Sequence, residues 1–290
     1  MSKSDQRLTN IFKNQTKRIC SLEFSSKKDI NYDLVDTIPF SFCSVIWIGT
    51  YDKPPEEIEP IVAAAELIKR GHPTVLHLAA RNVNKKTVPK ILEYARQVGV
   101  RNLLVMRGAA PGCQEPDSTY DFPYSTDLIK FIKIKYGDYF DLCVPGYPYK
   151  HPESKTLEED MKYLKQKNDA GAKFIISQAA FSYEIYKNFL KNCRKFEISM
   201  QIIPGVYMIR SVVDFCLLKK LCKVPTNDPV VQFIKDHKGS EDEIAAYGIK
   251  ISNEVIRKIL QDKDFCPPHI YTMNEFASIR DFISNLKLEK

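Results

Sequence analysis

The chain has 290 residues, of which 44% are hydrophobic, enough to bury a large core in one α/β domain or two small ones. Its formal net charge of +7 is modest and its lysines are spread along the sequence, which favours solvated helix faces over a nucleic-acid surface. A basic balance also suits an anionic small molecule such as a dinucleotide or a polyglutamate. No apolar run approaches the length of a membrane span. We therefore expect neither nucleic acid nor a membrane as a partner.

The eight cysteines occur singly, and no CxxC pair exists. This spacing argues against zinc-ribbon and redox motifs, and we expect no metal site. Cys43 and Cys143 lie inside apolar runs, as buried reduced thiols do, and no signal peptide opens the chain, so we expect a cytoplasmic protein. Residues 1–18 are basic and polar. We expect a flexible N-terminal arm there, with organelle targeting left open, and one domain over 19–290.

Short apolar runs rich in β-branched residues alternate with amphipathic segments about eight times. The runs predict strands over 19–24, 42–49, 74–80, 102–108, 141–147, 174–181, 200–205 and 269–274. They are apolar through both faces, as parallel strands covered by helices must be. Between them, apolar residues recur at helical spacing, for example at Leu157, Met161 and Leu164, with Gly171 closing the segment.

Eight strand–helix units in about 250 residues predict a single (β/α)8 TIM barrel, in which active-site groups come from the carboxyl ends of the strands. A doubly wound α/β sheet is the alternative, and it requires a phosphate loop after its first strand. The chain has neither a GxGxxG nor a Walker motif. The barrel is therefore favoured.

Polar or aromatic side chains stand where these strands end. Glu23 ends the first strand between Leu22 and Phe24, where loss of water would raise its pKa and favour a general acid. An ordinary ion pair with Lys27 or Lys28 is the alternative interpretation. His77 lies within the third strand, either as a core histidine or as a ligand contact.

Two further groups suit an anionic or heterocyclic ligand. Arg107 and Gly108 end the fourth strand, where they could bind a phosphate or a flavin edge or form a salt bridge. Asp160 and Lys167 share one face of the helix after the fifth strand, where they could hold a ribose and a phosphate or stay exposed. Gln178 ends an apolar strand, and an amide there usually recognises another amide or a heterocycle.

An ordered set of short motifs identifies a family. SLEF, LHL, MRG, YPYKHPES, DAGAKFIISQ, IIPG and YTMN follow one another between Ser21 and Ile283. In this order they resemble the catalytic domain of the methylenetetrahydrofolate reductases, without the C-terminal domain that binds S-adenosylmethionine. The resemblance implies a TIM barrel that binds FAD without a covalent bond. It also implies ping-pong hydride transfer from NADPH or NADH to 5,10-methylenetetrahydrofolate, in one-carbon and methionine metabolism. Oligomerisation of the chain with itself stays open.

The resemblance also implies roles for individual residues. Glu23 matches the acid that protonates the folate, and Gln178 and Tyr271 match folate contacts. The nicotinamide cofactor is expected to pass Glu23, Phe24, Ser25, Ser26, Lys27 and Lys28. The FAD contacts are expected to be Trp47, His77, Arg107, Gly108, Ala109, Tyr124, Ser125, Tyr147, His151, Pro152, Glu153, Ser154, Asp160 and Lys167.

The sequence departs from the family pattern at several of these positions. Ala109 stands where the family has an aspartate, Glu275 where it has an arginine, and Ile46 where a threonine usually meets the flavin. These changes keep an alternative open, namely a barrel of the same family that binds flavin or folate but has lost or altered the reaction. A flavin barrel that oxidises proline-like amines is a third possibility, but it does not share SLEF or YPYKHPES.

Overall fold

All the strands belong to one parallel sheet that closes on itself. The computed structural model describes residues 6–49, 52–108, 119–222, 224–225 and 228–286. The strands are β1 (Ser21–Phe24), β2 (Cys43–Val45), β3 (Thr74–Ala79), β4 (Asn102–Met106), β5 (Asp141–Gly146), β6 (Phe174–Ser177), β7 (Gln201–Ile203), β8 (Gly205–Val206) and β9 (His269–Tyr271). Neighbours follow the order β7-β6-β5-β4-β3-β2-β1-β9-β8.

Pro204 divides the seventh expected strand into two, and this division closes the ring. Before it, β7 pairs with β6; after it, β8 pairs with β9. Gly205 is required at this point because a Cβ there would meet the carbonyl oxygen of Ser177 at 2.1 Å. Because β7 and β8 are consecutive in the chain, the two ends of the described sheet meet at Pro204 and the barrel closes. The predicted TIM barrel is confirmed.

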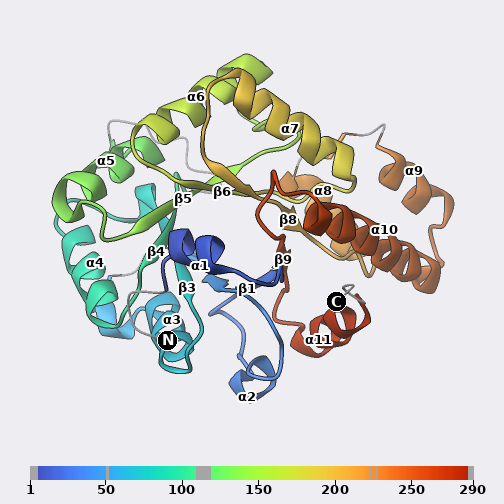
Figure 1. Cartoon of the computed structure of the whole chain (residues 1–290), viewed down its shortest axis with the longest axis horizontal. Helices are drawn as coiled ribbons and strands as arrows, with labels where there is room; N and C mark the ends of the chain where they lie inside the picture. Colours follow the sequence, from blue (N-terminus) through green and yellow to red (C-terminus); the bar gives the residue numbers. More distant parts are fainter. Residues whose placement is uncertain (1–5, 50–51, 109–118, 223, 226–227, 287–290) are drawn as a thin grey trace.

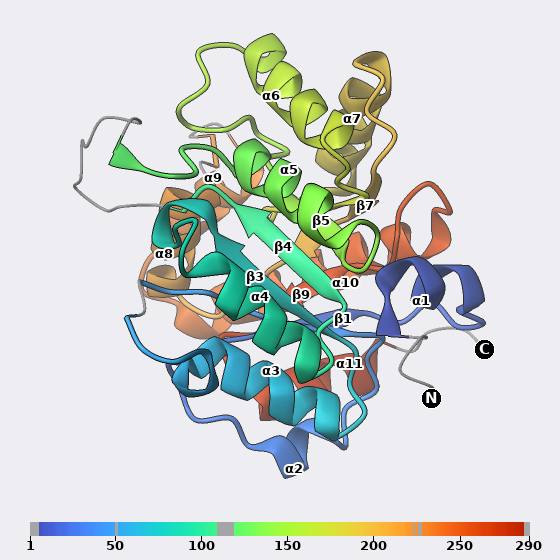
Figure 2. The same cartoon turned by 90° about the vertical axis from the view of Figure 1, so that its left-hand side faces the viewer.

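Helices cover the outside of the barrel (Figures 1 and 2). After α1 come α2 (Tyr32–Val35), α3 (Glu59–Lys69), α4 (Val88–Gln97), α5 (Ser125–Tyr136), α6 (Leu157–Asp169), α7 (Tyr183–Lys195), α8 (Val212–Cys222), α9 (Pro229–Asp236), α10 (Glu241–Gln261) and α11 (Phe276–Asn285). The short helices η2 (Pro55–Glu57) and η3 (Ala80–Asn82) complete the set. Within the described ranges, no helix combines the length and apolar character that crossing a membrane requires.

The expectation of a flexible arm over residues 1–18 is wrong for its described part. Residues Leu8–Asn14 form α1, which lies across the ring of strands at their amino ends (Figure 1). Leu8 is completely buried in a cluster with Phe42, Val75 and Leu104. Its N–H donates to Asn102 Oδ1 at 2.8 Å, and the N–H of Thr9 donates to Asp141 Oδ2 at 2.8 Å. The helix therefore plugs the end of the barrel opposite the carboxyl ends of the strands.

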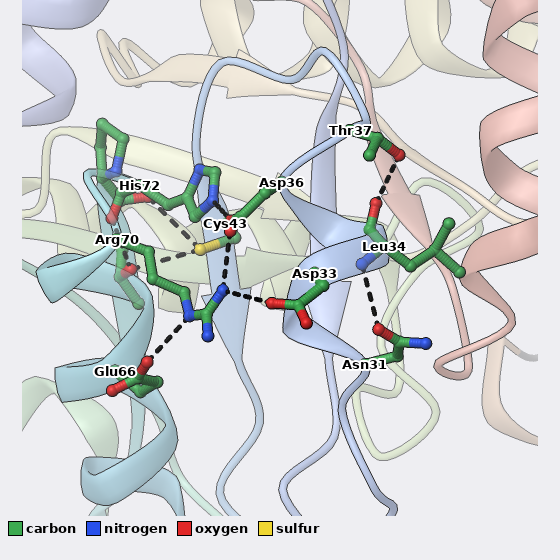
Figure 3. Close-up of polar contacts among 11 residues, drawn as sticks. Asn31, Asp33, Leu34, Asp36, Thr37, Cys43, Glu66, Arg70 and His72 are labelled. Carbon is green, nitrogen blue, oxygen red and sulfur yellow. Dashed lines mark hydrogen bonds and ion pairs between the residues drawn. The ribbon is translucent and has the colours of Figure 1, made fainter.

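An ion-pair network joins α2 to the connection between α3 and β3 (Figure 3). Arg70 contacts Asp33 at 3.1 Å, Asp36 at 2.7 Å and Glu66 at 2.8 Å. His72 Nε2 lies 2.7 Å from the second oxygen of Asp36. These pairs lower the pKa of Asp36, with the hydrogen bond from His72 as the largest cause. The network lies at the amino ends of the strands, the end of a TIM barrel that serves stability rather than catalysis.

The burial of Leu8 gives a first prediction. Leu8→Ala removes a completely buried side chain, and such changes cost about 2–5 kcal/mol. We expect a lower free energy of unfolding in urea and faster proteolysis near residue 8. The loss of stability cannot exceed the free energy with which α1 docks on the barrel. Lys13→Ala, at an exposed position of the same helix, is the matched control. A Leu8→Ala variant as stable and as protease-resistant as the control would contradict a docked plug.

Candidate functional site

The candidate residues gather at the carboxyl ends of the strands, at the end of the barrel opposite α1. Glu23 of β1 is paired in register with Tyr271 of β9 on one side and with Ser44 of β2 on the other. Because side chains alternate along a strand, Glu23 and Ser21 point to the interior while Leu22 and Phe24 point to the helices. The sequence therefore places an acid inside the mouth of the barrel.

The carboxyl group of Glu23 lies in a poorly hydrated position. The side chain is half-buried, and burial raises its pKa from 4.5 to about 8. Burial also raises the pKa of Tyr271 well above its usual range, with the nearby Glu23 as the second cause. The ammonium group of Lys28 donates to the carbonyl of Met273 at 3.1 Å. Glu23 therefore retains its proton at neutral pH.

A buried polar chain that the sequence did not reveal lies beneath Glu23. His269 of β9 is completely buried; its Nδ1 lies 2.7 Å from Ser21 Oγ and its Nε2 lies 2.9 Å from Ser44 Oγ. Burial lowers the pKa of His269 to about 3, so the ring is neutral. The only sequence signal was a histidine opening an otherwise apolar strand.

His77 also points into the barrel from β3. Its side chain is 4% exposed, and its Nε2 is a buried atom without a hydrogen-bond partner. Burial lowers its pKa to about 3. A buried unpartnered ring nitrogen costs free energy, and a ligand with a donor or acceptor at this position would satisfy it.

Arg107 follows β4 at the rim. Its Nη2 donates to both carboxylate oxygens of Glu153, at 2.5 Å and 2.6 Å. The Glu153 side chain is 60% exposed, so it can move away when an anion competes for the guanidinium. Gly108 follows with φ +87°, and a Cβ there would meet both Ala79 Cβ and Asn82 Oδ1 at 3.1 Å. Glycine allows this close approach of the backbone.

The loop after β5 and the first turns of α6 form a buried charged cluster. Asp160 is 8% exposed; its Oδ2 accepts from the backbone N–H of His151 at 2.9 Å and its Oδ1 from Ser154 Oγ at 3.4 Å. Burial lowers the pKa of Lys167 to about 8, against the opposing effect of Asp160. Burial likewise lowers the pKa of His151, which feels the charges of Asp160, Glu153, Arg107 and Lys167. These groups therefore lie within electrostatic reach of one another.

The other expected cofactor contacts surround this cluster or lie further along the rim. The Tyr147 ring packs edge-on against His151 with centroids 4.5 Å apart. Trp47 is buried and donates to the carbonyl of Gly49 at 3.0 Å. Tyr124 and Ser125 begin α5, with Tyr124 half exposed and Ser125 buried, while Pro152 is exposed. Ala109 lies outside the described residues.

Gln178 follows β6, which pairs with β5, and Tyr271 ends β9. The hydroxyl of Tyr271 donates to the carbonyl of Ser177 at 2.5 Å, which links β9 to the end of β6. Cys222, the last residue of α8, donates its thiol proton to Gln178 Oε1 at 3.6 Å. Nothing in the sequence indicated Cys222 at this site, because it is one thiol on the apolar face of a helix.

The segment expected to meet the nicotinamide cofactor divides into two parts. The Phe24 side chain is completely buried on the outer face of β1, where its ring lies 4.8 Å from that of Phe276. It therefore does not face the mouth. Ser25 follows on the rim and exchanges two 2.8 Å hydrogen bonds with the side-chain amide of Asn274. Ser26 is half-buried beyond it, and Lys27 and Lys28 are exposed.

The departures from the family pattern have different surroundings. Ile46 is half-buried just after β2. Ala179 and Ala180, which stand where the family resemblance leads us to expect an aromatic pair, are buried after Gln178. Glu275 lies on the rim, with its Oε2 3.9 Å from Arg210 Nη1, and Arg210 also contacts Asp214 at 3.4 Å. The acid at 275 is thus paired within the chain.

A cavity of about 550 Å³ opens outside this ring, beside the segment that leads into α4. Its lining includes Arg81, Asn84, Thr87 and Asp121, and none of the candidate site residues. The cavity nevertheless adjoins the candidate site, because its lining residue Asn82 lies beside Gly108.

Comparison with known sequences identifies the family. The family model described as methylenetetrahydrofolate reductase matches residues 16–287. A probable methylenetetrahydrofolate reductase (NADPH) of Caenorhabditis elegans is 34% identical over 229 residues, which cover 79% of this chain and 34% of that protein. A probable NADH-dependent counterpart from Oryza sativa is 31% identical, covering 74% and 38%. This chain thus spans about a third of the length of these two relatives.

One relative matches over most of its length, and one solved structure has a similar fold. The 5,10-methylenetetrahydrofolate reductase of Buchnera aphidicola is 30% identical over 274 residues, covering 88% of this chain and 87% of that protein. An uncharacterized protein from Clostridium thermocellum, described as binding two copies of 5-methyl-5,6,7,8-tetrahydrofolic acid, has a similar structure with a TM-score of 0.63. It is 13% identical and covers 95% of this chain and 98% of its own, so it bears on the fold alone.

The family model spans nearly the whole chain, and it therefore includes the barrel and the candidate residues at the ends of its strands. The resemblance seen in the sequence motifs is confirmed. This chain belongs to the methylenetetrahydrofolate reductase family.

Proposed function

We propose that this chain reduces 5,10-methylenetetrahydrofolate to 5-methyltetrahydrofolate with NADPH or NADH, using FAD held at the mouth of the barrel. Family membership supports the reaction class. Relatives named for NADPH and for NADH both match the chain, so the proposal includes either dinucleotide. The proposal also includes a cytoplasmic setting, supported by the free state of the described cysteines.

The observation that carries the proposal is the position of Glu23 inside the mouth, where burial raises its pKa. A general acid must hold its proton at the working pH and release it to the substrate, and the pKa of about 8 meets this requirement. The group lies inside the mouth and next to Tyr271, so a folate bound against Tyr271 would lie beside the acid. Protonation of the substrate nitrogen by Glu23 would help to open the five-membered ring.

The residues present fit FAD. Arg107 and Lys167 supply cations for a diphosphate, Asp160 supplies an acceptor for ribose hydroxyls, and His77 Nε2 is a buried ring nitrogen in need of a partner. Gly108 lets the backbone at the end of β4 pack closely against Ala79 and Asn82. When bound, the flavin would supply the hydride relay between the two substrates. Gln178 and Tyr271 would orient the folate at the ends of β6 and β9.

A second candidate function rests on Glu275. An acid paired with Arg210 stands where the family has an arginine, so the local charge at this part of the rim is changed. This observation favours a barrel of the same family that binds flavin or folate and has lost or altered the reductase reaction. Kinetics of the two half-reactions separate the candidates, since only the first transfers hydride to methylenetetrahydrofolate.

FAD binding is the first outcome to check. We expect the protein to take up FAD stoichiometrically and to show oxidised-flavin absorbance after dialysis. Lys167→Met should weaken FAD binding by about tenfold or more because a poorly hydrated cation near the diphosphate is lost. Lys165→Met is the matched control, since Lys165 lies on the same helix and pairs with Asp169. Equal FAD affinity in both variants would contradict the assigned site.

The role of Glu23 is tested by separating the half-reactions. In stopped-flow absorbance, Glu23→Gln should still let NAD(P)H bleach the flavin. Reoxidation by methylenetetrahydrofolate should slow by about 10²-fold or more, the usual contribution of a general acid. If both half-reactions slowed equally, Glu23 would serve the structure rather than proton transfer.

The protonation of Glu23 also predicts how stability depends on pH. Its folded-state pKa of about 8 exceeds the ordinary 4.5, so the folded chain binds more protons between these values. The stability that Glu23 contributes is present below pH 4.5 and lost as the pH rises through about 8. Glu23→Gln has no proton to lose, so its Tm should rise relative to that of the original protein between about pH 5 and pH 9. A Tm difference that is constant with pH would contradict the shifted pKa, and exposed Glu56→Gln is the control.

A further inference from the structure

Cys222 lies among the residues that line the mouth although it comes from a helix outside the ring. It ends α8, and with Phe215 and Leu218 it forms the buried face of that helix. Its thiol lies within electrostatic reach of the hydroxyl groups of Tyr147 and Tyr271. The sulfur therefore lies close to the ends of β5 and β9 as well as to Gln178.

The contact with Gln178 is directional. Cys222 Sγ lies 3.6 Å from Oε1 of the amide, and the thiol is 3% exposed. Burial raises the pKa of Cys222 to about 11, so the sulfur keeps its proton and acts as a donor. An amide whose oxygen accepts from the thiol has its nitrogen on the other side.

The backbone around Gln178 limits the alternatives. Its N–H donates to the carbonyl of Gly146 at 2.7 Å, which fixes the residue at the end of β6. The side chain is half-buried, and its Oε1 lies against the buried thiol of Cys222. Which of the two atoms faces the mouth decides whether the site offers a donor or an acceptor.

We propose that Cys222 is a positioning residue of the ligand site, whose thiol holds Gln178 Oε1 and thereby presents the Gln178 Nε2 donors to the mouth. The ligand class that this orientation fits has a carbonyl oxygen or an unprotonated ring nitrogen at its edge, as a lactam heterocycle does. The inference rests on the proposed folate site. Within that site, Cys222 is the group that orients the side-chain amide of Gln178. The thiol touches neither substrate nor cofactor.

The test measures binding of 5-methyltetrahydrofolate to the FAD-loaded protein by calorimetry. Cys222→Val keeps a buried side chain but removes the donor, and it should weaken binding by about threefold to tenfold, the factor of one modest hydrogen bond. Cys222→Ser restores a donor and should recover most of the loss. Cys216→Val, at an exposed position of the same helix, is the matched control. Equal binding by Cys222→Val and the control, or no recovery with serine, would overturn the proposal.

A double-mutant cycle distinguishes positioning from a general effect on packing. In a Gln178→Leu background, Cys222→Val should cause no further loss, because the thiol acts only through the amide. Additive losses would overturn the proposal, and Cys222→Ala serves if the valine variant does not fold. Absence of 5-methyltetrahydrofolate binding by the original protein would instead overturn the proposed function together with this inference. Normal binding with an insensitive Cys222 would overturn the inference alone.

Discussion

The loss of water around the Glu23 carboxyl group is the physical constraint on which the account of this protein depends. A carboxyl group in contact with water would be ionised at neutral pH and could not act as an acid there. Burial of Glu23 at the end of β1 reverses this preference and raises its pKa to about 8. The neighbouring Tyr271, with its hydroxyl bonded to Ser177, belongs to the same poorly hydrated region.

That environment exists because the barrel is closed and sealed. The break at Pro204 lets β7 and β8 close the sheet, and Gly205 allows the backbone to approach Ser177. At the other end, Leu8 and the rest of α1 cover the interior. The polar chain of Ser21, His269 and Ser44 satisfies its own hydrogen bonds beneath Glu23, so it does not require water there. The amino end of the barrel thus carries the contacts that stabilise the fold. The carboxyl end carries side chains with shifted pKa values or without a hydrogen-bond partner.

Much of this arrangement could be predicted from the sequence. Each apolar run that predicted a strand contains at least part of one, and the run over 200–205 contains parts of two, because parallel strands buried on both faces leave a strong local pattern. The position of Glu23 at a strand end followed from the same pattern. The break at Pro204 and the docking of α1 could not be predicted, because both depend on closure of the ring and not on local propensity. LTNIFKN reads as a polar segment, and only the exposed amino end of the barrel gives Leu8 a place to be buried.

The contacts of single side chains were the least predictable part. Nothing local to Arg107 indicates that Glu153 holds it, and nothing near Cys222 in the sequence indicates Gln178. The orientation of Phe24 toward α11 follows from strand alternation, yet the family motif alone placed it with the nicotinamide segment. Long-range contacts of this kind appear only when the strands are assembled.

The most direct test is a pH titration of the Glu23 carboxyl carbon by ¹³C NMR in the folded protein, with Glu23→Gln used to assign the signal. If Glu23 is the buried acid, its carboxyl signal should show a single titration with a midpoint near the pKa of about 8. A midpoint near the ordinary value of 4.5 would mean that Glu23 is ionised at neutral pH, and it would contradict the account.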